Sequence, residues 1–176
     1  MSFMCSISHS LVTEIGVSYG YQKRTFNADN YYQSESKTAN VSFYFLERFA
    51  LELNYTNAFY ENQESDTRST RVTQQSTEAT GADLIYVFTD KSAMFQPYIK
   101  GGSAYIAKKV QIRYVNVDTI DIPTKNGFAP SYGAGLKFKL NEQFSFKISY
   151  DIWKTPLDDG NSADDASFKA GISMYL

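Results

Sequence analysis

Few side chains in this sequence could carry out catalysis or hold a metal ion. The chain of 176 residues contains one His and one Cys, so it is poorly equipped for a zinc site and cannot form a thiolate cluster or an internal disulfide. Both residues, His9 and Cys5, lie in the first ten positions, with no second His or acidic cluster beside His9. We therefore expect a protein that is not an enzyme and has no catalytic site, metal ion or cofactor.

Four carboxylates lie close together near the C-terminal end of the chain, at Asp158, Asp159, Asp164 and Asp165. Carboxylate oxygens could hold a divalent cation. An acidic run of this kind is more often a solvated, charged loop. We expect such a loop here.

Eight other charged residues share one property: each stands at a polar position of a segment in which apolar and polar residues alternate. The acids are Glu14, Glu52, Asp83 and Asp151, and the bases are Lys100, Lys137, Lys147 and Lys169. Inside a closed, dry structure each of these charges needs a partner, because an unpaired buried charge costs several kcal/mol. Four acids and four bases would then form one neutral ion-pair network, whereas a face open to solvent would also carry both signs.

The segments that carry these charges follow a period of two residues, which is typical of strands with two different faces. The alternating windows are residues 11–21, 39–45, 49–59, 82–88, 95–107, 132–140, 144–152 and 168–176. No position on their apolar faces is charged, and no helical periodicity of comparable length competes with them. The pattern predicts an all-β protein.

The connections between the windows alternate in length. Short links fall at residues 46–48, 89–92 and 141–143, and long polar links fall near residues 24–36, 60–77, 108–128 and 154–165. Short turns at one end and long loops at the other predict an eight-stranded antiparallel up-and-down barrel. We expect residues 1–10 to be an N-terminal tail and residues 11–176 to be a single barrel domain.

Alternation alone does not say which face of the barrel points inward. The polar face is rich in Gly, Ser and Ala, which suit the narrow interior of an eight-stranded barrel. Aromatic residues cluster at both ends of the apolar face, as in the two girdles of a barrel that crosses a bilayer. Those near the short turns are Phe45, Phe49, Phe88, Phe95, Phe138 and Phe144, and those near the long links are Tyr19, Tyr21, Tyr55, Phe59, Tyr105, Tyr132 and Tyr150. Trp153 lies near the long links as well, but the alternation puts it on the polar face, which would point into the barrel. The pattern favours a transmembrane barrel over a soluble, lipocalin-like carrier of an apolar ligand.

Two stretches carry a family resemblance. Residues 95–105 (FQPYIKGGSAY) and residues 132–150 (YGAGLKFKLNEQFSFKISY) resemble strands of the OmpA-like and OmpX/Ail-type outer-membrane barrels. The C-terminal pattern Lys169-x-Gly171-x-x-Met174-x-Leu176 resembles the signal that such proteins present to the barrel-assembly machinery.

The resemblance implies a Gram-negative outer membrane, short periplasmic turns, longer extracellular loops and insertion by that machinery. It also implies an internal ion-pair cluster, which would fall on Glu52, Lys100, Lys137 and Lys147. Residues 1–10 do not form a secretory signal, so we expect the export signal to lie outside this sequence. The peptidoglycan-binding domain of OmpA proper is not expected in this chain either.

For function, the sequence favours a non-enzymatic outer-membrane barrel with a plugged polar lumen and a structural or surface-interaction role, such as adhesion or partner binding. Residues 110–122 keep alternating past the membrane window, which predicts a projecting ribbon whose edge could recruit a partner strand. Residues 67–77 are rich in Thr and could project in the same way. A narrow or gated pore and the soluble carrier are the alternatives. The formal net charge of −2 argues against a nucleic-acid partner.

A set of basic residues lies just beyond the upper aromatic girdle, at the level of lipopolysaccharide phosphates. The set consists of Lys23, Arg24, Lys108, Lys109, Arg113 and Lys154. Basic side chains at this level would pair with the phosphates of outer-membrane lipids and lipopolysaccharide. On a soluble barrel they would be ordinary surface charges.

Overall fold

The computed structural model describes residues 12–27, 29–66, 69–114, 119–124, 126–156 and 162–176. The predicted tail with Cys5 and His9, and the acidic positions Asp158 and Asp159, lie outside the described residues. The strands are β1 (Val12–Thr25), β2 (Tyr31–Tyr44), β3 (Phe49–Asp66), β4 (Ser69–Val87), β5 (Phe95–Tyr114), β6 (Ile120–Ile122), β7 (Gly127–Lys139), β8 (Phe144–Pro156) and β9 (Ser162–Tyr175). No helix in this part of the chain is long and apolar enough to cross a membrane.

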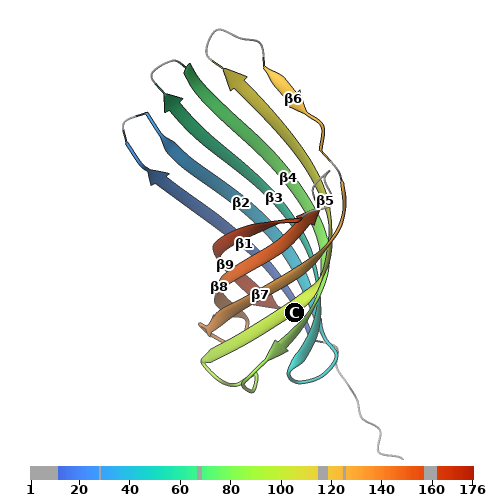
Figure 1. Ribbon diagram of the computed structural model, residues 1–176. Helices are drawn as coiled ribbons and strands as arrows, with labels where there is room; N and C mark the ends of the chain where they lie inside the picture. The colour runs from blue at the N-terminus through green and yellow to red at the C-terminus, as the bar shows by residue number, and fades with distance from the viewer. Residues whose placement is uncertain (1–11, 28, 67–68, 115–118, 125, 157–161) are drawn as a thin grey trace, which may run out of the picture.

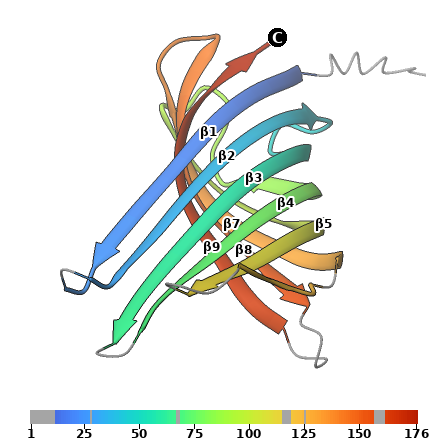
Figure 2. The same cartoon turned by 90° about the horizontal axis from the view of Figure 1, so that it is seen from above.

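The sheet closes on itself. Its strands follow the order β4-β3-β2-β1-β9-β8-β7-β5-β6, and β4 also pairs with β5. All pairings are antiparallel. The short strand β6 pairs with no described strand other than β5, and only with its outer part. The other eight strands form the closed barrel (Figures 1 and 2). This confirms the predicted fold.

Burial alternates along much of the barrel strands, and the polar face is the buried one. Glu14 and Lys137 are fully buried, whereas Val17 and Ile172 are more than half exposed. Water alone would not favour this distribution, since burying apolar area is the main favourable contribution to folding. The soluble-carrier alternative is therefore wrong, because a lipocalin-like barrel would hold its apolar side chains inside.

The strands are longer than the sequence pattern indicates. The polar stretches expected as loops near residues 24–36, 60–77 and 108–128 lie largely in strands, and β3 pairs with β4 as far as Asp66 and Ser69. Where both faces of a strand meet water, the alternation of apolar and polar residues disappears although the backbone ladder continues. Figure 1 shows β1 to β5 rising together beyond β8 and β9.

The junction between the first and last strands is short. β1 pairs with β9 from Glu14↔Tyr175 to Tyr19↔Ala170, whereas it pairs with β2 along its whole length. Beyond Tyr19 the two strands diverge, and Figure 2 shows β1 and β9 crossing at a wide angle. The upper part of β1 therefore lies beside an opening in the barrel wall.

The interior has apolar groups on both sides of its charged middle. One cluster lies near the short turns and consists of Tyr44, Ala50, Ile85, Val87 and Tyr98. The other lies toward the long strands and consists of Ala79, Ala104, Ile106, Ala129 and Trp153. Trp153 thus has the interior orientation that its phase predicts. Ion pairs between buried groups are stronger than ion pairs in water.

Candidate functional site

Glu52 on β3 lies at the centre of the buried charges in the barrel. Its Oε1 lies 3.0 Å from Lys100 Nζ, and its Oε2 lies 3.0 Å from Lys147 Nζ. Asn40 and Ser42 on β2 donate further hydrogen bonds to Oε2, at 3.0 and 3.2 Å. The carboxylate is fully surrounded by donors, which offsets the cost of removing it from water.

Lys100 on β5 connects this centre to the other wall of the barrel. Its ammonium lies 3.1 Å from Asp151 on β8 and 3.5 Å from Asp83 on β4. Asp151 in turn forms an ion pair with Lys169 on β9, whose Nζ lies 3.0 Å from Asp151 Oδ2. Charged contacts therefore link strands that are remote from one another in the sheet.

Lys137 and Glu14 form a separate pair nearer the short turns. Their charged atoms lie 2.5 Å apart, and the Tyr44 hydroxyl donates to the same carboxylate oxygen at 2.6 Å. The resemblance placed Lys137 in one cluster with Glu52, whereas its ion-pair partner in the structure is Glu14. Lys137 stands directly opposite Lys147 in the β7–β8 ladder, so the two like charges turn to different carboxylates.

All eight predicted lumen residues lie on the inner face of the barrel and make ion pairs with one another. Such an array can hold distant walls of the barrel together. Among the described residues, no group of His, Cys, Asp and Glu side chains could hold a metal ion.

The predicted rim cations do not form one surface. Lys23, Lys109 and Arg113 are exposed at outward-facing positions, and so is Lys154. Lys108 differs from them, because its ammonium pairs with Asp165 on β9 at 2.9 Å and its side chain is 9% exposed. Its parity matches that of Lys100 on the same strand, so the alternation along β5 would have placed it inside.

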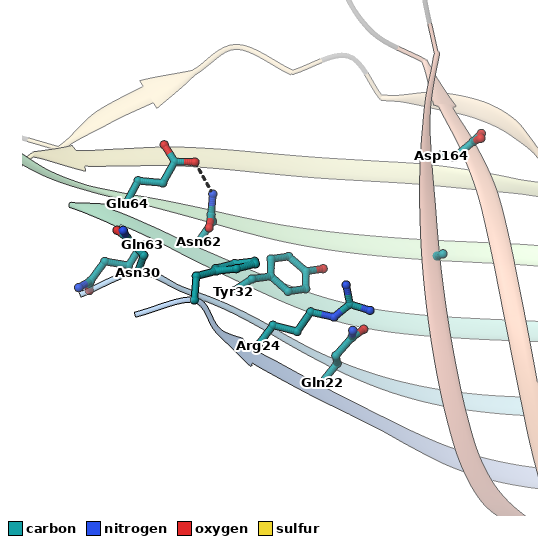
Figure 3. A pocket seen from close by; sticks show the side chains of 10 residues that line it. Gln22, Arg24, Asn30, Tyr32, Asn62, Gln63, Glu64 and Asp164 are labelled. Atoms are coloured by element: carbon teal, nitrogen blue, oxygen red, sulfur yellow. Dashed lines mark hydrogen bonds between the residues drawn. The ribbon is translucent and has the colours of Figure 1, made fainter. Parts of the chain in front are cut away.

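Arg24 lines a polar cleft that the sequence did not reveal (Figure 3). The cleft has a volume of about 700 Å³ and lies where β1 and β9 diverge. Its lining residues are Gln22, Arg24, Phe26, Asn30, Tyr32, Asn62, Gln63, Glu64, Asp164 and Ala166. Figure 3 shows Asp164 on a strand opposite the wall that carries Arg24 and Tyr32.

A smaller hollow of about 220 Å³ adjoins the cleft, and Tyr32, Tyr60, Asp164 and Asp165 contribute to its walls. Burial raises the pKa of the Tyr32 and Tyr60 hydroxyls, because a buried phenolate would lose its hydration. Both hydroxyls are therefore neutral at physiological pH and can donate as well as accept hydrogen bonds.

The family described as outer membrane protein beta-barrel domain matches residues 8–175. The chain belongs to this family. Membership places it in the bacterial outer membrane, among non-enzymatic barrels with structural, adhesive or small-solute roles. It also fixes the environment of the exposed apolar face, which meets lipid.

Solved outer-membrane barrels share the fold at low sequence identity. Neisserial surface protein A is 11% identical with a TM-score of 0.62, over 94% of this chain and 97% of that one. OprG of Pseudomonas aeruginosa is 10% identical with a TM-score of 0.63, over 94% and 95%. Ail of Yersinia pestis, solved with the heparin analogue sucrose octasulfate, is 13% identical with a TM-score of 0.58, over 94% and 99%. No curated protein matches the chain in sequence.

The family match confirms the predicted outer-membrane barrel family, and these likenesses confirm its fold. In an outer-membrane barrel of this kind, the end with short turns faces the periplasm and the end with long strands faces the exterior. The polar cleft and the extended parts of β1 to β5 therefore lie on the outside of the cell.

Proposed function

We propose that this outer-membrane barrel is a non-enzymatic surface-interaction protein whose lumen is closed by ion pairs. The observation that carries the proposal is the continuation of β3, β4 and β5 beyond the upper aromatic girdle. β4 pairs with β5 out to Arg71 and Tyr114, so these strands form a firm polar sheet in water. A sheet held by a continuous backbone ladder can present a fixed surface to a partner.

The short strand β6 offers the edge of this sheet. It pairs with β5 from Val110↔Ile122 to Ile112↔Ile120, and no strand of the described chain covers its other side. Ile120 and Ile122 are 46% and 39% exposed. An exposed edge with apolar side chains is suited to accept an extended segment of another protein by strand addition.

A lipid contact accompanies this role. Lys23, Lys109, Arg113 and Lys154 point outward above the aromatic girdle, where the phosphates of lipopolysaccharide lie. Ammonium and guanidinium groups pair with phosphate through charge-assisted hydrogen bonds. These cations would fix the height of the barrel in the outer leaflet.

The experiment compares surface adhesion by cells that express the wild type and the double variant Ile120→Lys/Ile122→Lys. Charged side chains on an edge strand oppose strand addition, so we expect adhesion to fall at equal surface expression. The control is Thr25→Lys, which adds a charge to an exposed position on β1, away from the β6 edge. Undiminished adhesion of the double variant would refute the proposed role of β6.

The competing function is a narrow or gated pore. Eight strands leave an interior that side chains fill, and here the filling is the ion-pair array around Glu52 and Lys100. We expect no conductance steps when the purified barrel is held under voltage in a planar bilayer at neutral pH. Reproducible steps would favour the pore and show that the array opens.

A further inference from the structure

We propose that the polar cleft between the upper parts of β1, β2, β3 and β9 binds an uncharged oligosaccharide. This inference rests on the proposed surface-interaction role, because it names a ligand class for the outer rim. The cleft faces the exterior, has a volume of about 700 Å³ and lies apart from the β6 edge. Four side-chain amides line it, from Gln22, Asn30, Asn62 and Gln63.

Two of these amides are oriented by contacts with the backbone. The Asn30 oxygen accepts a hydrogen bond from the Ser65 N–H, which leaves the Asn30 NH₂ group as the donor on offer. The Gln63 nitrogen donates to the Asp29 carbonyl at 2.9 Å, which leaves the Gln63 oxygen as an acceptor. A fixed donor beside a fixed acceptor matches neighbouring hydroxyl groups, each of which both donates and accepts.

The lining of the cleft carries one cation, Arg24, and two anions, Glu64 and Asp164. Glu64 accepts hydrogen bonds from Asn62 Nδ2 and Arg71 Nη2, both at 2.9 Å, and Figure 3 shows the first of these. When the Gln22 side-chain amide is oriented so that its oxygen faces Arg24, that oxygen accepts a hydrogen bond from Arg24 Nε at 2.8 Å. Arg71 does not line the cleft but pairs with Glu64, so the lining offers no surplus of positive charge. A polyanion would need an excess of cations here, whereas a neutral polyol needs only oriented polar groups.

Two aromatic rings complete the cleft. Phe26 is 71% exposed, so its ring is accessible to a ligand. Tyr32 lies half-buried on β2, beside the amides. Sugar rings carry apolar C–H faces between their hydroxyls, and these faces stack on aromatic rings while the hydroxyls bond to the amides.

The test is saturation-transfer NMR on the full chain, refolded in phosphocholine micelles so that no sugar detergent competes for the cleft. The probes are maltotriose, triacetylchitotriose and lactose, with sucrose octasulfate for comparison. We expect saturable binding of at least one neutral sugar. We also expect Tyr32→Ala and Gln22→Ala to weaken that binding at least tenfold.

The matched control is Gln33→Ala. Gln33 lies next to Tyr32 on β2 but on the opposite face of that strand, so its replacement should change sugar affinity less than twofold. Each variant is first shown to be folded by its heat-dependent shift on an SDS gel. Failure of every neutral sugar to bind, binding of sucrose octasulfate alone, or equal affinity in wild type and both cleft variants would each overturn the proposal. None of these results concerns adhesion through β6, which the Ile120→Lys/Ile122→Lys variant tests separately.

Discussion

The ammonium of Lys100 lies 3.0 Å from Glu52 Oε1, although 48 positions separate the two residues in the sequence. They stand on β5 and β3, with β4 between them, and their side chains meet inside the barrel. Because Lys100 also contacts Asp83 and Asp151, one ammonium balances a large share of the negative charge in the lumen. The stability of the barrel therefore depends on this lysine more than on an exposed one.

Replacing Lys100 by Met should destabilise the barrel strongly. The variant leaves Glu52, Asp83 and Asp151 with too little positive charge, and breaking a buried pair in this way costs about 3–5 kcal/mol. The free energy of unfolding can be measured by urea titration in micelles, with Trp153 fluorescence as the signal. Lys109→Met is the control, since Lys109 is exposed and points outward. Equal midpoints for the two variants would contradict the geometry.

The Glu14–Lys137 pair should behave as a unit distinct from Glu52. In a double-mutant cycle, Glu14→Gln and Lys137→Met should show a coupling energy of about 0.5–3 kcal/mol, since the residues are in contact. The cycle of Glu52→Gln with Lys137→Met should give a clearly smaller coupling. A larger coupling to Glu52 would support the single cluster that family resemblance implied and count against the observed pairing.

Gly135 should tolerate no side chain. A Cβ at this position would meet the ring of buried Tyr98 and the carbonyl oxygen of Ile148, so Gly135→Ala should cost about 1–3 kcal/mol through overpacking. Gly101 is the control, because a Cβ there would meet only the Ser131 oxygen at 3.9 Å. Gly101→Ala should be neutral or stabilising in the same urea titration. The prediction is wrong if both variants unfold at the same midpoint.

The outer rim should show a mild pH dependence through Glu61. The Tyr31 hydroxyl donates to Glu61 Oε1 at 2.5 Å, and this hydrogen bond is the main cause that lowers the pKa of the Glu61 carboxyl below 4.5. A lowered folded-state pKa means that the contact contributes stability above the unfolded pKa and loses it as the pH falls through the folded value. The contribution is small, because both groups lie at the outer rim and are only partly buried.

Carboxyl-carbon NMR titration of Glu61 can check this dependence. In Tyr31→Phe the pKa of Glu61 should rise toward its ordinary value. The matched control is Tyr21→Phe, which removes an outward-facing hydroxyl from β1 that makes no described hydrogen bond with Glu61. An unchanged Glu61 titration in Tyr31→Phe would show that the hydroxyl does not stabilise the carboxylate.

Part of this structure follows from the sequence alone. The period of two residues assigns each side chain to one face of its strand, so the inner positions of Glu14, Glu52, Lys100 and Trp153 could be predicted before any pairing was known. Parity would also have placed Lys108 inside. Its position just beyond the aromatic girdle instead predicted a contact with lipid phosphates. The structure shows Lys108 paired with Asp165, because the level of a residue along a strand does not decide which face of the sheet it occupies.

Other features depended on the tertiary structure. Parity puts Lys137 and Lys147 on the same inner face, but only the register between β7 and β8 sets them opposite each other and sends them to Glu14 and Glu52. The alternation of apolar and polar residues did not predict the full length of β3 and β4, because a strand with water on both faces has no apolar face to repeat every second residue. The cleft exists because β1 and β9 part beyond Tyr19 and Ala170. The sequence by itself determined which face of each strand is polar, since that is a local property of alternation. Which charges pair and where the wall opens were decided by contacts between strands far apart in the chain.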